Sequence, residues 1–161
     1  MIASGYAAAM RKRIIAAAVV ALVVIACGGA GFVMTQPPDY HDYRKTANQA
    51  ADAAYGAVRT TALTIGALLE HRVTGPYTTV VVDDALTSVS SATQQLAAVP
   101  PPDDRTRALR AELEPLLAEA ARILGDVSTA LDGGAPDQIR TAAKNLGQVG
   151  DRLDDYLQEH A

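Results

Sequence analysis

Hydrophobic residues recur in steps of three and four along four stretches of the chain after Pro37. This spacing marks one face of an α-helix, whereas a half-buried strand would alternate. Proline and glycine separate the stretches at residues 75–76, 100–102 and 133–136. The pattern therefore predicts four helices, at about residues 39–72, 77–99, 103–132 and 136–159.

Each predicted helix carries one apolar stripe, and the stripe of the first helix is built mostly from small residues. The first stripe comprises Ala47, Ala51, Ala54, Val58, Ala62, Ile65 and Leu69. The second comprises Val82, Leu86, Val89, Ala92 and Leu96. The third comprises Leu109, Leu113, Leu116, Ala120, Ile123, Val127 and Leu131, and the fourth Ile139, Ala142, Leu146, Val149, Leu153 and Tyr156. Because alanine side chains are short, we expect the first helix to approach its neighbours closely.

Two local features act against this pattern. The run TTVVV at residues 78–82 favours a strand by propensity, but the residues after it are helical in spacing and no second strand is available for pairing. Pro115 lies inside the third helix, where it removes one backbone hydrogen bond and crowds the carbonyl of Ala111. We therefore predict helix in both places, with a kink at Pro115.

The links between the predicted helices are short, so consecutive helices are expected to run in opposite directions. Asp132-Gly133-Gly134-Ala135, for example, makes a hairpin of the last two helices. We predict an all-α fold, in which an N-terminal membrane-spanning or signal-anchor helix precedes an antiparallel, up-down-up-down four-helix bundle.

Residues 14–34 form an apolar run of 21 residues without a charge. A helix of that length rises about 30 Å, which is the thickness of a hydrocarbon core. The basic residues Arg11, Lys12 and Arg13 precede the run, so residues 1–13 are expected in the cytoplasm and residues 35–161 outside it. In this interpretation Cys27 is an ordinary residue of a single-pass membrane helix.

The same run also has the features of a lipoprotein signal peptide. Val24-Ile25-Ala26-Cys27 is similar to a lipobox, and translation from Met10 would place the basic cluster directly after the start. Cys27 would then be the lipidated first residue of a protein held on the outer face of the membrane. If the run spans the membrane instead, Gly28, Gly29 and Gly31 form a candidate face for close packing with another membrane helix.

Charge and composition narrow the class of partner. The chain holds 14 Lys and Arg against 18 Asp and Glu, and removal of the basic cluster at residues 11–13 leaves the remainder with a net charge of −7. An acidic body without a basic face argues against nucleic acid as a partner. Cys27 is the only cysteine, which excludes an intramolecular disulfide. Abundant alanine, with Arg in excess of Lys, is typical of a GC-rich bacterial genome.

No catalytic, metal or cofactor motif is recognisable. HExxH, GxGxxG, a P-loop and GxSxG are all absent, and the helix pattern places His41, His71 and His160 at helix ends, as solvated side chains. The acidic pairs at residues 83–84, 103–104 and 154–155 are adjacent in sequence, so their members diverge by about 100° on a helix. Two of these pairs are interpreted as belonging to helix starts. We therefore expect no enzymatic activity and no cofactor.

One surface of the second predicted helix is polar without being charged. Besides Ser90, this surface comprises Thr87, Ser88, Ser91, Gln94 and Gln95. Uncharged polar groups lose less free energy on desolvation than charged ones do, so this face is a candidate contact for a partner, although it is equally compatible with simple exposure to solvent.

These observations predict a membrane-anchored, non-enzymatic interaction, scaffold or accessory protein of a bacterial envelope. The expected partners are the lipid bilayer and another envelope protein, and a homo-oligomer is compatible with the sequence. The alternative is a lipoprotein module that holds a small apolar or glycan ligand within the bundle, since small side chains can leave space between helices.

Overall fold

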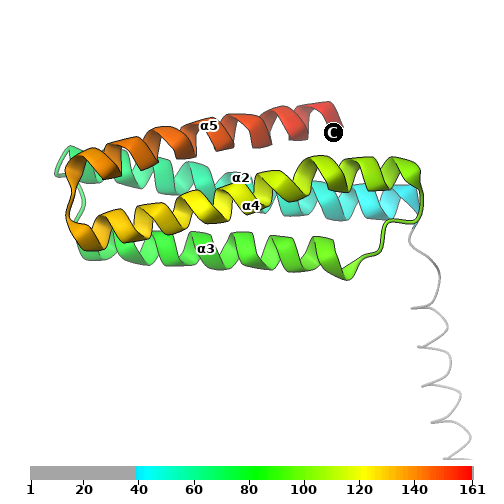
Figure 1. Cartoon of the computed structure of the whole chain (residues 1–161), viewed down its shortest axis with the longest axis horizontal. Coiled ribbons are helices and arrows are strands. Elements are labelled where there is room, and N and C mark those ends of the chain that lie inside the picture. Colours follow the sequence, from blue (N-terminus) through cyan, green and yellow to red (C-terminus); the bar gives the residue numbers. More distant parts are fainter. Residues whose placement is uncertain (1–38, 161) are drawn as a thin grey trace, which may run out of the picture. The chain divides into compact units, whose positions relative to one another are not determined.

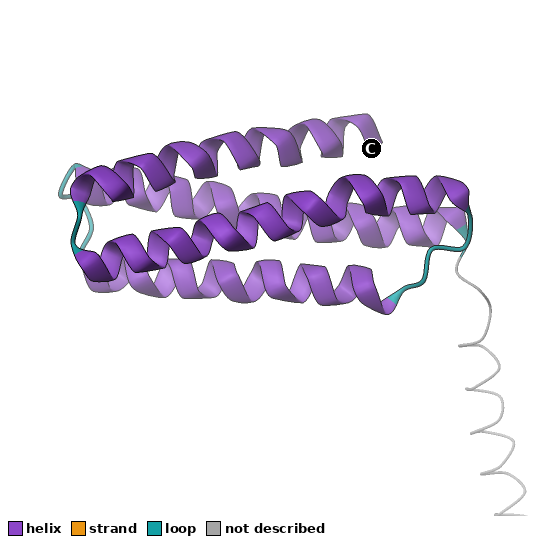
Figure 2. Cartoon of the chain, in the orientation of Figure 1, coloured by secondary structure: helices purple, strands orange, loops and turns teal. Residues whose placement is uncertain are grey.

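The computed structural model describes residues 39–160, which form four α-helices and no strand. These are α2 (Tyr40–Leu69), α3 (Gly75–Ala98), α4 (Asp104–Gly133) and α5 (Pro136–His160) (Figures 1 and 2). The prediction of an all-α, four-helix region is confirmed for this part of the chain. None of these four helices is long and apolar enough to cross a membrane. The predicted anchor at residues 14–34, with Cys27 and its glycines, lies outside the described residues.

Consecutive helices run in opposite directions, side by side (Figure 1). α2 packs against α3 and α5, and α4 also packs against both of them. α2 and α4 additionally contact each other across the bundle, whereas no such contact joins α3 and α5. The small buried side chains of α2, which include Ala47, Ala51 and Ala54, explain why α2 and α4 approach each other more closely than α3 and α5 do.

The predicted stripes form the core of the bundle. All six residues of the α5 stripe are buried, as is the α4 stripe except for Leu131, which is partly exposed. In α2 and α3 the buried side is rotated slightly from the predicted one, because Thr61 and Ala85 are buried while Ala62 and Leu86 are only partly so. The core also contains residues outside the stripes, namely Tyr43, Ala50, Thr78, Thr106, Leu117, Leu124, Ala130 and Gly150.

Side-chain caps fix where two of the helices begin. Asp39 accepts a hydrogen bond from the backbone N–H of Asp42 at 2.9 Å at the start of α2. Asp103 and Thr106 form a capping box at the start of α4, in which each side chain bonds the other residue's backbone N–H. Such caps satisfy N–H groups that have no partner within the helix.

The predicted boundary between the first two helices was wrong in one respect. Gly75-Pro76 was expected to stop the first helix, but it begins α3, with the proline in the first turn where its missing N–H costs nothing. α2 already ends at Leu69, because His71 takes a left-handed conformation with φ of 58°. The N–H groups of His71 and Arg72 then donate to the carbonyls of Leu68 and Ala67.

α4 continues as one helix through Pro115. The proline is on the exposed side of the helix, so its ring displaces no core side chain. The residues 78–82, whose propensity favours a strand, are helical in α3, as the spacing after them predicted.

Candidate functional site

The candidate contact surface on α3 lies on the outside of the bundle. We call Thr87, Ser88, Ser91, Gln94 and Gln95 the α3 face. All five are exposed except Ser88, which is half-buried. The hydroxyl of Thr87 donates to the backbone carbonyl of Asp83, and that of Ser88 to the carbonyl of Asp84. Because these donors are already satisfied within the helix, covering them with a partner would leave no unpaired hydroxyl proton.

This face belongs to a long segment with very little charge. Between Arg72 and Asp103 the only charged residues are Asp83 and Asp84, and both are exposed. Neither aspartate forms an ion pair with another residue in the range 39–160. α4, by contrast, carries ten charged side chains, including four arginines. α3 is therefore the part of the bundle surface that a protein partner could desolvate most cheaply.

Three large apolar side chains are exposed near the junction of α2 and α3. Leu63 is 76% exposed, Tyr77 is 55% and Val80 is 57%. We call them the α2–α3 apolar patch. No site was predicted at these residues, although large apolar side chains that lie off the predicted stripes are a signal visible in the sequence. Exposed apolar side chains that gather at one end of a surface are typical of interaction sites.

A shallow groove of about 320 Å³ runs between α2 and α3 and adjoins the α3 face. It is lined by Asp52, Ala53, Gly56, Ala57, Thr60, Val81, Asp84, Ala85 and Ser88. Leu63 follows Thr60 by one helical turn, and Tyr77 precedes Val81 by one turn. The apolar patch therefore continues this groove toward the loop between α2 and α3.

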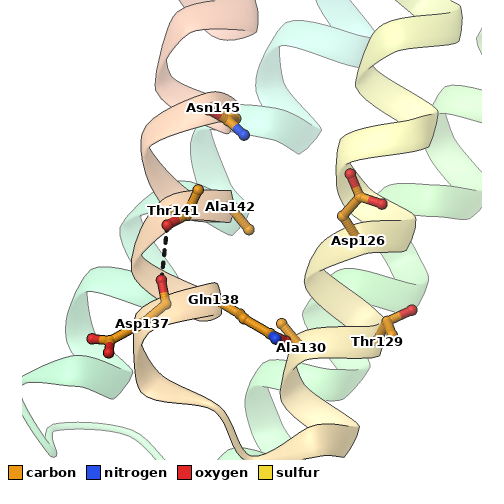
Figure 3. Close-up of a pocket in the computed structure, with 8 residues that line it drawn as sticks. All are labelled: Asp126, Thr129, Ala130, Asp137, Gln138, Thr141, Ala142 and Asn145. Carbon is orange, nitrogen blue, oxygen red and sulfur yellow. Dashed lines mark hydrogen bonds between the residues drawn. The ribbon is translucent and has the colours of Figure 1, made fainter.

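A second groove, of about 460 Å³, separates the C-terminal half of α4 from the N-terminal half of α5 (Figure 3). Six of its eight lining residues have polar side chains, and the lining comprises Asp126, Thr129, Ala130, Asp137, Gln138, Thr141, Ala142 and Asn145. Asp126 pairs with Arg122 at 2.7 Å, and Asp137 pairs with Arg140 at 2.6 Å. In Figure 3 the carboxylate of Asp137 points away from α4, so the two acidic groups do not converge on one reacting atom.

The histidines and acidic pairs give no second site. Among residues 39–160 no group of three or more His, Cys, Asp or Glu side chains is arranged to hold a metal ion. His41 and His71 are exposed as predicted, but His160 was wrongly described as solvated. Its ring stacks edge-on against Tyr156, and its Nε2 lies 2.8 Å from Glu112 Oε2.

Of the acidic pairs, only the one at residues 103–104 lies at a helix start; residues 83–84 lie inside α3.

Two tyrosine hydroxyls are buried at the end of the bundle where α2 begins. The hydroxyls of Tyr43 and Tyr156 have no hydrogen-bond partner among the described residues. Burial raises the pKa of Tyr156, with a smaller contribution from the negative charge of Glu112. Burial likewise raises the pKa of Tyr43, although Arg110 opposes the shift. Because both hydroxyls keep their protons, neither is suited to act as a base near neutral pH.

Comparison with protein-family models, with curated proteins and with solved structures finds no match to this chain.

Proposed function

We propose that this chain is a membrane-anchored, extracytoplasmic, non-enzymatic helical-bundle protein of a bacterial envelope, acting as an interaction, scaffold or accessory protein. The anchor is the apolar run at residues 14–34, either as a single-pass helix or, after processing, as a lipid on Cys27.

The observation that carries the proposal is the uncharged surface of α3. On the α3 face the hydroxyls of Thr87 and Ser88 are already bonded within the helix, and the α2–α3 apolar patch extends this face toward one end of the bundle. A partner that covers both surfaces would gain the burial of Leu63, Tyr77 and Val80, and on α3 it would desolvate only Asp83 and Asp84 among charged groups. The partner is therefore expected to offer apolar side chains and a cation opposite those carboxylates.

Site-specific crosslinking in native membranes tests this proposal. A photoreactive amino acid is placed at Ser91, on the α3 face, and in a separate variant at Lys144, which is exposed on α5. A crosslinked product of defined mass is expected from Ser91 and not from Lys144. A product of twice the chain's mass would identify a homo-oligomer as the partner. Equal yields from both positions, or none from either, would refute the proposed contact surface.

Two substitutions that add a negative charge strengthen the same test. Thr87→Glu places a carboxylate on the α3 face, and its control Thr129→Glu places one on the exposed side of α4. The crosslink from Ser91 is expected to fall with Thr87→Glu, because the partner must then desolvate an additional charge. A crosslink that survives Thr87→Glu unchanged would place the contact elsewhere on the bundle.

A lipoprotein module that binds a glycan is the second candidate, favoured by the polar lining of the α4–α5 groove. Hydroxyl and amide groups from Thr129, Gln138 and Asn145 suit a sugar better than an apolar ligand. The experiment is an NMR titration with N-acetylglucosamine oligomers. Shifts of the Asn145 and Gln138 side-chain amides, with the Gln138 shift lost in Asn145→Ala, would support this candidate, and unchanged amide signals would exclude it.

A further inference from the structure

The cations of the bundle divide into paired and unpaired groups. Seven of the Lys and Arg side chains among residues 39–160 lie within 4.0 Å of a carboxylate oxygen; these are Arg59, Arg72, Arg107, Arg110, Arg122, Arg140 and Arg152. The others, which form no such ion pair in this range, are Arg44, Lys45, Arg105 and Lys144. Arg44, Lys45 and Arg105 all lie in the first two turns of α2 or α4, which begin at the same end of the bundle (Figure 1).

Two of these cations line a groove of about 440 Å³ between the start of α2 and the end of α5. Its lining comprises His41, Arg44, Lys45, Asn48, Gln49, Asp52 and Leu157. Asp52 is the only carboxylate in that lining, and it lies about 10 Å farther along the helix axis than Lys45. The mouth of the groove nearest the start of α2 is therefore cationic, with the amide groups of Asn48 and Gln49 behind it.

A third cation is held beside the same helix start. The guanidinium of Arg105 lies over the ring of Tyr40, 4.3 Å from its centroid. Of the carboxylates nearby, Asp39 and Asp103 cap their helices and Asp104 pairs with Arg107. Asp42 and Glu159 are exposed at the same end and form no ion pair in the described region. Even so, none of the three cations has a described carboxylate oxygen within 4.0 Å.

The number of residues between the predicted anchor and α2 limits how far the start of α2 can lie from that anchor. Only residues 35–39 separate the apolar run from Tyr40, the first residue of α2. Five extended residues span at most about 17 Å, whereas the opposite end of α2 lies about 45 Å farther along a helix of this length. The tether therefore keeps the unpaired cations at the start of α2 within reach of the headgroups at any tilt of the bundle.

We propose that Arg44 and Lys45, assisted by His41 and Arg105, bind the phosphate groups of anionic phospholipids and hold this end of the bundle on the membrane surface. The inference rests on the proposed anchor at residues 14–34. Guanidinium and ammonium groups donate charge-assisted hydrogen bonds to phosphate oxygens, and Leu157 gives the groove an aliphatic side toward the lipid. This contact would fix the orientation of the bundle and leave the α3 face, which lies on the side of the bundle, free to bind a partner.

The lysines of the chain provide the test, because Lys12, Lys45 and Lys144 are its only three. The full chain is inserted into nanodiscs of phosphatidylcholine alone or with phosphatidylglycerol, and treated with a water-soluble amine-reactive reagent. Mass spectrometry then gives the labelling rate at each lysine. With phosphatidylglycerol, Lys45 is expected to react at least about fivefold more slowly, while Lys144 reacts equally in both. Salt at 1 M, where the Debye length is about 3 Å, should abolish the difference.

The controls separate the possible failures. Arg44→Gln should restore most of the labelling of Lys45, whereas the matched variant Arg140→Gln, at the other end of the bundle, should not. A chain that does not stay with either nanodisc would remove the anchor and this inference together. A retained chain whose Lys45 reacts equally in both lipids would overturn the inference and leave the anchor intact. Equal protection of Lys45 by free inorganic phosphate would assign the groove to a soluble anion instead.

Discussion

Two helices of the bundle end in the same hydrogen-bonded motif with different residues at its left-handed position. α2 has His71 there, at φ of 58°, and α4 has Gly134, at φ of 61°. In both, the N–H of this residue and the next donate back to carbonyls of the last helical turn. We predict that His71→Gly raises the free energy of unfolding by about 0.5–1 kcal/mol and that Gly134→Ala lowers it by about 1 kcal/mol.

These changes in the free energy of unfolding come from the backbone conformation, because the side chain makes no stabilising contact at either position. His71 is exposed and its side chain forms no hydrogen bond or ion pair with the described residues. A Cβ added at Gly134 would meet nothing within 4 Å. The left-handed conformation costs a residue with a Cβ about 1–2 kcal/mol. Glycine avoids that cost, but it also increases the conformational entropy of the unfolded chain, which lowers the free energy of unfolding by about 0.4–1 kcal/mol.

The assay is urea unfolding followed by circular dichroism on residues 38–161, the compact unit that contains all four helices. The denaturation midpoint should rise for His71→Gly and fall for Gly134→Ala at an unchanged slope. His71→Ala serves as the control, because it removes the imidazole and keeps the strained backbone, and it should change stability little. A destabilised His71→Gly variant, or a neutral Gly134→Ala variant, would refute this reading of the two helix ends.

Three further predictions concern the core and the surface of the bundle. Leu113→Ala should lower the free energy of unfolding by about 2–5 kcal/mol because Leu113 is fully buried, whereas Leu63→Ala and Ser90→Ala should stay within about 0.5 kcal/mol in the same urea titration. Tyr43→Phe should be neutral or stabilising by up to about 1 kcal/mol, since its buried hydroxyl has no partner in the described region; a loss above about 1 kcal/mol would reveal a hydrogen bond. Because the folded state raises the pKa of Tyr156 above 10.0, the contribution of Tyr156 to stability should be constant below about pH 10 and fall above it, and Tyr156→Phe should flatten the decline of stability above about pH 10.

The helices were predictable from sequence because the apolar spacing repeats over many turns. In α5 every residue of the predicted stripe is buried, from Ile139 to Tyr156. The buried threonines were not predictable in the same way, since they are polar by type. Thr61 and Thr78 enter the core only because their hydroxyls donate to the carbonyls of Ala57 and Thr74 one turn earlier.

Helix ends were less predictable than helix interiors. A Gly-Pro pair is compatible with the end of one helix or the start of the next, and the structure uses Gly75-Pro76 for the start of α3. The end of α2 depends on His71, a residue type that takes the left-handed conformation more often than most side chains but far less readily than glycine. Candidate surfaces were partly predictable. The lack of charge on α3 is visible in sequence, but the two grooves that involve α5 require the spatial pairing of segments far apart in the chain.

The proposal that residues 14–34 hold the bundle on a membrane can be tested by the intact mass of the protein from its native membrane fraction. A membrane-bound species is expected, either full-length and unmodified or beginning at Cys27 with acyl chains attached. The first result would make Gly28, Gly29 and Gly31 part of a spanning helix, and the second would leave the bundle on a lipid tether. A species that lacks residues 1–34, carries no acyl chain and leaves the membrane fraction would contradict this proposal.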